Sequence, residues 1–200
     1  VLPISQRGET FTLGATDHVV EYAVKMRQFP QSSLLSHCFE QGELTEALLL
    51  QLAEKIADFH QRAETNDYIR SFGTVDNIRQ SIDENYEQTV AFIGGPQTQK
   101  QFDETKAFTD EFFAARQPLF QRRIDQDKIR ACHGDLHLNN IAYWQNELML
   151  FDCIEFNEPF RYVDVMFDIA YIMMDLAVSG RDDLAAVFLS HYVECTGDWD

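Results

Sequence analysis

Apolar residues recur with helical spacing over most of this chain, and one short polar loop with two short strands interrupts them. Thr45 is predicted to cap a helix ending near Ala63, because apolar residues follow at positions 48, 49, 52, 56 and 59. Further helices are predicted over 75–93, 98–124, 163–177 and 182–193. The spacing therefore predicts an α+β chain in which helices predominate.

The first thirty residues have a different pattern. Residues 9–13 alternate between apolar and polar, Gly14 breaks the alternation, and residues 18–26 form a second strand-like run that ends before Pro30. We therefore expect two parts, a β-rich segment over residues 1–30 and a helical segment over residues 31–200.

The interruption of the helical pattern holds the polar residues of greatest interest. The loop His133-Gly-Asp-Leu-His-Leu-Asn-Asn140 is followed by two strand-like runs, 141–144 and 148–151, and then by Asp152. Antiparallel strands joined by a short turn form a hairpin, which brings its two ends together. The pattern therefore predicts that Asp152 returns to a position beside Asn140.

These residue types suit phosphoryl transfer, which needs an oriented hydroxyl, a bound metal and neutralised phosphate charge. Asp135 could orient the hydroxyl and accept its proton. Asn140 would offer a neutral oxygen to Mg²⁺ and Asp152 a charged one, and Mg²⁺ prefers such oxygen ligands.

A different chemistry is also compatible with part of this loop. His133, Asp135 and His137, together with Asp152, could form a transition-metal site of a hydrolase, because imidazole and carboxylate bind such metals. This alternative lacks a second histidine cluster at helical spacing and gives Asn140 no role. The pattern favours phosphoryl transfer.

The loop and the spaced aspartate carry a resemblance to a known family. The pattern H-G-D-x-x-x-x-N, with Asp152 lying 17 residues after Asp135, resembles the catalytic and metal-binding segments of aminoglycoside phosphotransferases, choline kinases and related small-molecule kinases. The resemblance implies a protein-kinase-like fold that uses ATP and Mg²⁺. It implies that Asp135 is the catalytic base, that Asn140 and Asp152 bind Mg²⁺, and that His133 supports the catalytic loop.

Two other segments extend the resemblance, which covers roughly residues 45–195. Residues 52–60 are similar to the family's helix that ends in a buried histidine, here His60. Residues 151–170 are similar to a bacterial subgroup whose members can be fused to a C-terminal P-loop ATPase domain, so such a domain is an implied partner. The resemblance does not name the acceptor beyond a small molecule with a hydroxyl.

The resemblance also gives an expectation for the N-terminal part. Residues 18–26 look like the last strand of the N-lobe and the hinge, so the backbone of Val24, Lys25 and Met26 is expected to contact adenine. Lys25 is not assigned as the phosphate-binding lysine, because the chain runs from it almost directly into the helical part. We expect residues 1–30 to be a remnant of the N-lobe and residues 31–200 to be the helical C-lobe.

On this basis we expect the chain to be a fragment of a longer protein and to be inactive by itself. A further alternative is a kinase fold retained as a non-catalytic nucleotide-binding or regulatory module. The presence of Asp135, Asn140 and Asp152 argues against that alternative for the parent protein.

Net charge and cysteine usage limit the partners. The formal net charge of −17 argues against nucleic acid or an anionic membrane surface. Residues 152–200 hold 11 acids and two bases, which would favour a cationic acceptor.

No apolar run approaches the roughly 20 residues that span a bilayer. The four cysteines form no C-x-x-C pair, which indicates reduced thiols and a cytoplasmic location.

Several other residues have structural expectations. His60 is expected to be a hydrogen-bonded core histidine, and Asp164 and Asp168 are expected to cap a helix or brace the loop. The phenylalanines between residues 102 and 120 are expected to lie in the core.

Overall fold

The computed structural model describes all 200 residues as two compact units, Val1–Gln31 and Ser32–Asp200. Its secondary structure is α+β with helix predominating, as the periodicity predicts. None of the helices is both long enough and apolar enough to cross a lipid bilayer.

The first unit is a three-stranded antiparallel sheet in the order β2-β1-β3. Its strands are β1 (Leu2–Arg7), β2 (Thr10–Leu13) and β3 (Val19–Ala23). The alternation in the sequence indicated the second and third strands, and it missed β1, which lies between them in the sheet. The strand-like run predicted to Met26 ends at Ala23, so residues 24–26 follow the sheet without strand pairing.

The second unit contains all the helices. They are α1 (Leu35–Glu40), α2 (Glu46–Arg62), α3 (Asp67–Ser71), α4 (Val75–Thr89), α5 (Gln99–Asp125), α6 (Glu158–Arg161), α7 (Val165–Val178) and α8 (Asp182–Thr196). Short 3-10 turns lie at Val90–Phe92 and Leu138–Asn140, and another, Gln31–Ser33, spans the boundary between the two units.

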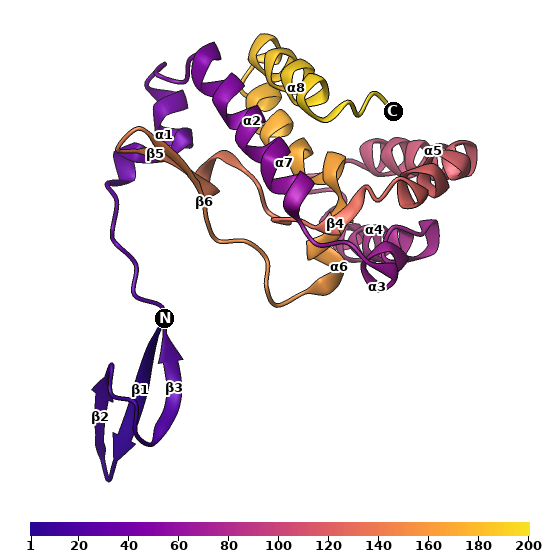
Figure 1. Ribbon diagram of the computed structural model, residues 1–200. Helices are drawn as coiled ribbons and strands as arrows, with labels where there is room; N and C mark the ends of the chain where they lie inside the picture. Colours follow the sequence, from indigo (N-terminus) through magenta and orange to yellow (C-terminus); the bar gives the residue numbers. More distant parts are fainter. The chain divides into compact units, whose positions relative to one another are not determined.

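The core of the second unit forms where α2, α7 and α8 lie together (Figure 1). The side chain of Thr45 accepts a hydrogen bond from the backbone N–H of Leu48, which caps α2 at its predicted start. Helical spacing then turns Leu52 and Ile56 toward α8, where Phe188 is fully buried. This three-helix core is the support on which the polar loop rests.

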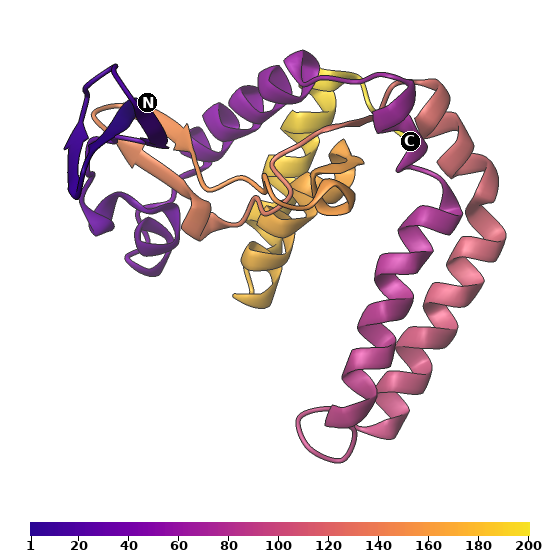
Figure 2. The same ribbon diagram turned by 90° about the horizontal axis from the view of Figure 1, so that it is seen from below.

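Helices α4 and α5 form an antiparallel pair (Figure 2). The predicted boundaries at residues 75 and 98 are correct to within a residue, and Thr98 caps α5 with a capping box. The expectation that all the phenylalanines of α5 are core is wrong. Phe113 is buried, but Phe108 is 70% exposed and Phe112 39% exposed. No residue of α4 is fully buried, so the contact between the two helices is limited. Helix α4 therefore covers only part of the apolar surface of α5.

Two small antiparallel pairs frame the loop between residues 132 and 140. Strands β4 (Ile129–Ala131) and β7 (Tyr162–Asp164) pair with Ile129 opposite Asp164. Strands β5 (Ile141–Trp144) and β6 (Glu147–Leu150) form a hairpin with Ile141 opposite Leu150. Its two turn residues, 145 and 146, both have positive φ, as the favoured two-residue hairpin turn requires.

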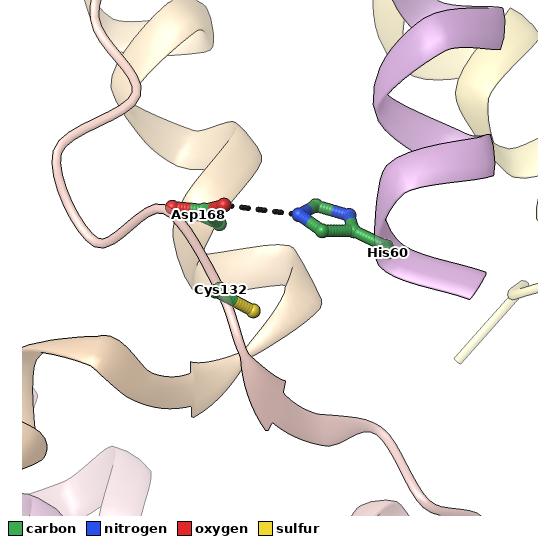
Figure 3. A group of neighbouring side chains, drawn as sticks. All are labelled: His60, Cys132 and Asp168. Carbon is green, nitrogen blue, oxygen red and sulfur yellow. Dashed lines mark hydrogen bonds and ion pairs between the residues drawn. The ribbon is translucent and has the colours of Figure 1, made fainter. Parts of the chain in front are cut away.

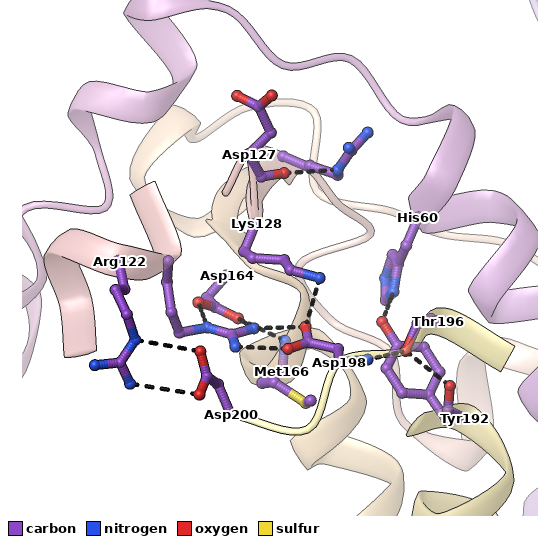
Figure 4. A network of polar contacts seen from close by, with 12 residues as sticks. His60, Arg122, Asp127, Lys128, Asp164, Met166, Tyr192, Thr196, Asp198 and Asp200 are labelled. Atoms are coloured by element: carbon purple, nitrogen blue, oxygen red, sulfur yellow. Dashed lines mark hydrogen bonds and ion pairs between the residues drawn. The ribbon is translucent and has the colours of Figure 1, made fainter. Parts of the chain in front are cut away.

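A buried ion network fixes the start of α7 (Figure 4). The Asp164 side chain caps the helix by accepting from the backbone of Met166, and it also accepts from the Arg123 guanidinium. Arg123 donates twice more to Asp198, at 2.9 Å each, and the Lys128 ammonium lies 3.2 Å from Asp198. The network thereby joins α5, β7 and the end of α8.

Candidate active site

His133 links the polar loop to the end of the hairpin. Its Nε2 lies 2.8 Å from the carbonyl oxygen of Phe151. A carbonyl only accepts, so Nε2 carries the hydrogen, and Nδ1 accepts weakly from the backbone N–H of Asp135 at 3.4 Å. Because both ring nitrogens are engaged and the ring is buried, His133 positions the loop and offers no free nitrogen to a metal.

Gly134 meets a requirement that only glycine satisfies here. Its φ is +83°, and a Cβ at this position would lie 2.5 Å from the carbonyl oxygen of Phe160. The loop therefore passes close to the backbone of α6 at the residue immediately before Asp135.

Asp168 of α7 holds this part of the loop. Its two carboxylate oxygens accept from the backbone N–H groups of His133 at 3.0 Å and Gly134 at 2.8 Å. The Nε2 of His60 lies 3.0 Å from the same carboxylate. Figure 3 draws this contact as a dashed line between the two side chains. Asp168 is fully buried, and this set of donors satisfies its charge. The expectation that it braces the loop is confirmed.

His60 extends this support into the helical core. An ionised carboxylate only accepts, so the His60 Nε2 donates to Asp168, and the other ring nitrogen, Nδ1, lies 2.8 Å from the Tyr192 hydroxyl. Burial raises the pKa of this hydroxyl, and nearby negative charge raises it further. His60 is confirmed as a hydrogen-bonded core residue.

The cluster of His60, Cys132 and Asp168 brings three possible metal ligands within 4.8 Å of one another. Each is already engaged in hydrogen bonds. His60 and Asp168 make those described above, and the Cys132 Sγ lies 3.5 Å from the carbonyl oxygen of Val163. The cluster is therefore a hydrogen-bonded brace.

Asp135 and Asn140 meet in front of this brace. The Asn140 Nδ2 donates to the Asp135 carboxylate at 3.1 Å and to its backbone carbonyl at 2.9 Å. Since the amide nitrogen makes both bonds, the Oδ1 of Asn140 is left for another partner. The Asp135 side chain is 38% exposed, so a substrate can reach it.

His137 lies beside the same oxygen of the Asp135 carboxylate that Asn140 contacts. Its Nδ1 accepts from the backbone N–H of Asn139 at 3.2 Å, and its Nε2 lies 3.4 Å from Asp135 Oδ2. His137 is therefore placed beside the Asp135 carboxylate, where it can help to orient it.

The hairpin brings Asp152 back to the loop. The backbone N–H of Phe151 donates to the carbonyl of Asn140 at 3.1 Å, so Asp152 follows directly after a residue bonded to Asn140. Asp152 is exposed and has a positive φ of 61°, an uncommon conformation for a residue other than glycine. Such backbone strain is found most often where a side chain must point in a particular direction.

The predicted adenine contacts lie in the other unit. Val24 and Met26 are 69% and 80% exposed, and Lys25 between them is also exposed. The loop and the hairpin thus bring together His133, Asp135, Asn140 and Asp152 within one unit, and residues 24–26 belong to the unit Val1–Gln31.

Sequence reasoning missed Asp175, the second support that α7 gives to the loop. Its carboxylate accepts from the backbone N–H of Leu138 at 2.8 Å. Asp168 and Asp175 are seven residues apart, which places them on one face of the helix. The sequence did contain a signal for Asp175. Two acids at this spacing on an otherwise apolar helix indicate that both side chains bind the same neighbouring segment, here the loop.

The chain was compared with known proteins. The model of the phosphotransferase enzyme family matches residues 16–200. Uncharacterized protein Rv2004c of Mycobacterium tuberculosis and uncharacterized protein Mb2027c of Mycobacterium bovis are each 33% identical to the chain over 178 residues. The matched regions cover 89% of this chain and 36% of each relative, so the chain spans about a third of the length of these curated relatives. No solved structure gives a significant match.

The family match includes the whole polar loop and the hairpin after it, which are the segments that carry the resemblance to aminoglycoside phosphotransferases and choline kinases. This chain therefore belongs to the phosphotransferase enzyme family.

Proposed function

We propose that Asp135, Asn140 and Asp152 form the site of an ATP-dependent phosphotransferase that phosphorylates a hydroxyl of a small molecule. The observation that carries the proposal is the pairing of the Asn140 amide with the Asp135 carboxylate, beside which the hairpin returns Asp152. The family match supports it, because family membership implies a kinase-like fold and phosphoryl transfer as the chemistry.

In this proposal Asp135 is the general base. The acceptor hydroxyl gives its proton to the Asp135 carboxylate, its oxygen bonds to the γ-phosphorus, and the bond from that phosphorus to the bridging oxygen of ADP breaks. Asn140 and His137 both contact Oδ2 of this carboxylate, which lowers the cost of orienting it for the reaction.

The donor set fits Mg²⁺. The Asn140 Oδ1 is not used by the Asp135 contact, and Asp152 presents an exposed carboxylate, so the pair offers one neutral and one charged oxygen. When bound, Mg²⁺ would neutralise phosphate charge. These two residues would hold the ion.

The remaining parts of the proposal concern the nucleotide and the acceptor. We propose that residues 1–30 are an N-lobe segment in which the backbone of Val24, Lys25 and Met26 contacts adenine, and that residues 31–200 are the C-lobe. The excess of acids over residues 152–200 supports an acceptor that carries a positive charge.

Calorimetry on the full-length protein should distinguish the role of Asp152 from that of Asp135. Asp152→Asn removes the charged metal ligand, so we expect ATP affinity in the presence of Mg²⁺ to fall more than about tenfold. Asp135→Asn should leave that affinity within about threefold, because Asp135 orients the acceptor and not the nucleotide. Glu147→Gln, an exposed change on the same hairpin, is the control. An unchanged Mg²⁺-dependent affinity in Asp152→Asn would contradict the assignment.

A further inference from the structure

Tyr171 lies beside the catalytic loop. It stands on α7 three residues after Asp168 and four before Asp175, so helical spacing puts the three side chains on adjoining parts of one face. Asp168 and Asp175 accept from the backbone at the two ends of the loop, at His133 and Gly134 and at Leu138. The Tyr171 ring lies between Asp168 and Asp175 on α7. It therefore lies next to the middle of the loop, at Asp135.

An electrostatic effect agrees with this placement. Burial raises the pKa of the Tyr171 hydroxyl, and the negative charges of Asp135 and Asp168 raise it further. A carboxylate shifts a neighbouring group in this way only over a short distance.

Tyr171 is also part of an exposed apolar stripe along α7. Phe167, Tyr171, Met174 and Val178 follow one another at spacings of four, three and four residues, which place them in one line on the helix surface. Phe167 is 49% exposed, Met174 58% and Val178 89%, and the Phe167 ring packs edge-on against Tyr171 at 5.6 Å. Single exposed apolar residues are common on soluble proteins, whereas a continuous line of them is typical of a binding surface.

The stripe continues into a shallow apolar groove between α7 and α8. The groove has a volume of about 380 Å³ and is lined mainly by Met173, Met174, Ala177, Ala185, Ala186 and Leu189. Met174 belongs to both the stripe and the groove. It follows Tyr171 by three residues, about 4.5 Å along the helix axis. The stripe therefore extends along α7 from Tyr171 to Met174, at the edge of the groove.

We propose that this surface binds the apolar part of the hydroxyl acceptor, so that the substrate is an alcohol carrying an alkyl chain or a similar apolar group. The inference rests on the proposed function, because it is the reaction at Asp135 that requires the acceptor hydroxyl to lie at one end of the stripe. A flexible alkyl chain suits the methionine-lined groove, since methionine side chains adapt their shape to apolar ligands.

The test uses straight-chain primary alcohols from propanol to octanol with the full-length protein and ATP. Each methylene that the stripe buries should raise kcat/KM about fourfold. In the double variant Phe167→Gln/Met174→Gln the ratio of kcat/KM for hexanol to that for propanol should fall toward one. The control Phe108→Gln changes an equally apolar residue, 70% exposed on α5, and should leave that ratio unchanged.

A second readout does not depend on catalysis. The protein is labelled with ¹³C-methyl methionine, and the NMR signal of Met174 is assigned by its loss in Met174→Gln. This NMR signal should shift as hexanol is added without ATP. Phosphoryl transfer with no dependence on chain length, or a Met174 signal that hexanol leaves unmoved because protein already covers the stripe, would overturn the inference and leave the proposed function standing. A shifted Met174 signal without transfer to any of these alcohols would support an apolar binding surface and contradict the assignment of alkyl alcohols as acceptors.

Discussion

At the scale of single residues, one buried carboxylate organises the start of the loop that holds Asp135. Asp168 accepts from two loop N–H groups and from His60, and it is shielded completely from solvent. Backbone N–H groups buried without an acceptor are costly, so the conformation of the loop at His133 and Gly134 depends on this side chain.

Replacing Asp168 by Asn should therefore be severe. The amide would present hydrogens toward donors, so we expect a loss of about 3 kcal/mol in the free energy of unfolding and about a 100-fold loss in kcat from displacement of Asp135. Urea denaturation and turnover measure the two effects. Asp175→Asn is the matched comparison, because it affects only the bond from Leu138, and it should cost about 1 kcal/mol. Equal losses in the two variants would show that Asp168 has no special role.

At the scale of helices and strands, the buried network of Arg123 joins α5 to α7 and to the end of α8. Asp198 is almost fully buried. Burial alone would raise its pKa, but the hydrogen bonds and charges of Arg123 and Lys128 outweigh burial and lower the pKa below its ordinary value. A carboxyl whose pKa is lower in the folded than in the unfolded protein stabilises the fold when it is ionised.

The resulting stability should depend on pH. At neutral pH we expect Asp198→Asn to cost about 3 kcal/mol, because it leaves Arg123 with Asp164 as its sole anionic partner. This contribution is complete above the unfolded pKa of about 4 and is lost as the pH falls through the lower folded pKa. The difference between wild type and variant should therefore shrink in denaturant titrations below about pH 4. Asp200→Asn, which breaks an exposed pair with Arg122, should cost less than about 1 kcal/mol.

The sequence predicted the elements whose signals are local. Helix α2 followed from the Thr45 cap and the helical spacing after it, and the hairpin followed from two short apolar runs across a turn. The pairing of β4 with β7 was not predictable, since these three-residue strands lie far apart in the sequence. Whether a face is covered also depends on the tertiary structure, which is why Phe108 was wrongly expected to be core.

The candidate site was predictable to the extent that it is one contiguous motif. The positions of Asp135 and Asn140 in the loop, and the return of Asp152 by the hairpin, follow from spacing within 20 residues. The supports come from elsewhere in the chain, and only the packing of α7 against the loop reveals that Asp175 and Tyr171 adjoin it. Residues 24–26 were predicted from resemblance alone, and that prediction stays open.

At the scale of the whole molecule, a strongly negative chain would have to bind a negatively charged nucleotide at the proposed site. Its net charge of −17 repels free triphosphate, so productive binding requires the local neutralisation that Asn140 and Asp152 would provide with Mg²⁺. The same charge favours acceptors without negative groups. Function therefore depends on whether Asp135, Asn140 and Asp152 act as one site.

The most direct measurement of that claim is the rate of phosphoryl transfer from radiolabelled ATP to an alcohol, compared between the full-length protein and its Asp135→Asn variant. Removing the base while keeping the shape of the side chain should lower kcat about 1,000-fold, and Glu147→Gln on the neighbouring hairpin should leave the rate unchanged. Transfer by Asp135→Asn within threefold of wild type would show that Asp135 is not the base, and that the site at this loop has been misassigned.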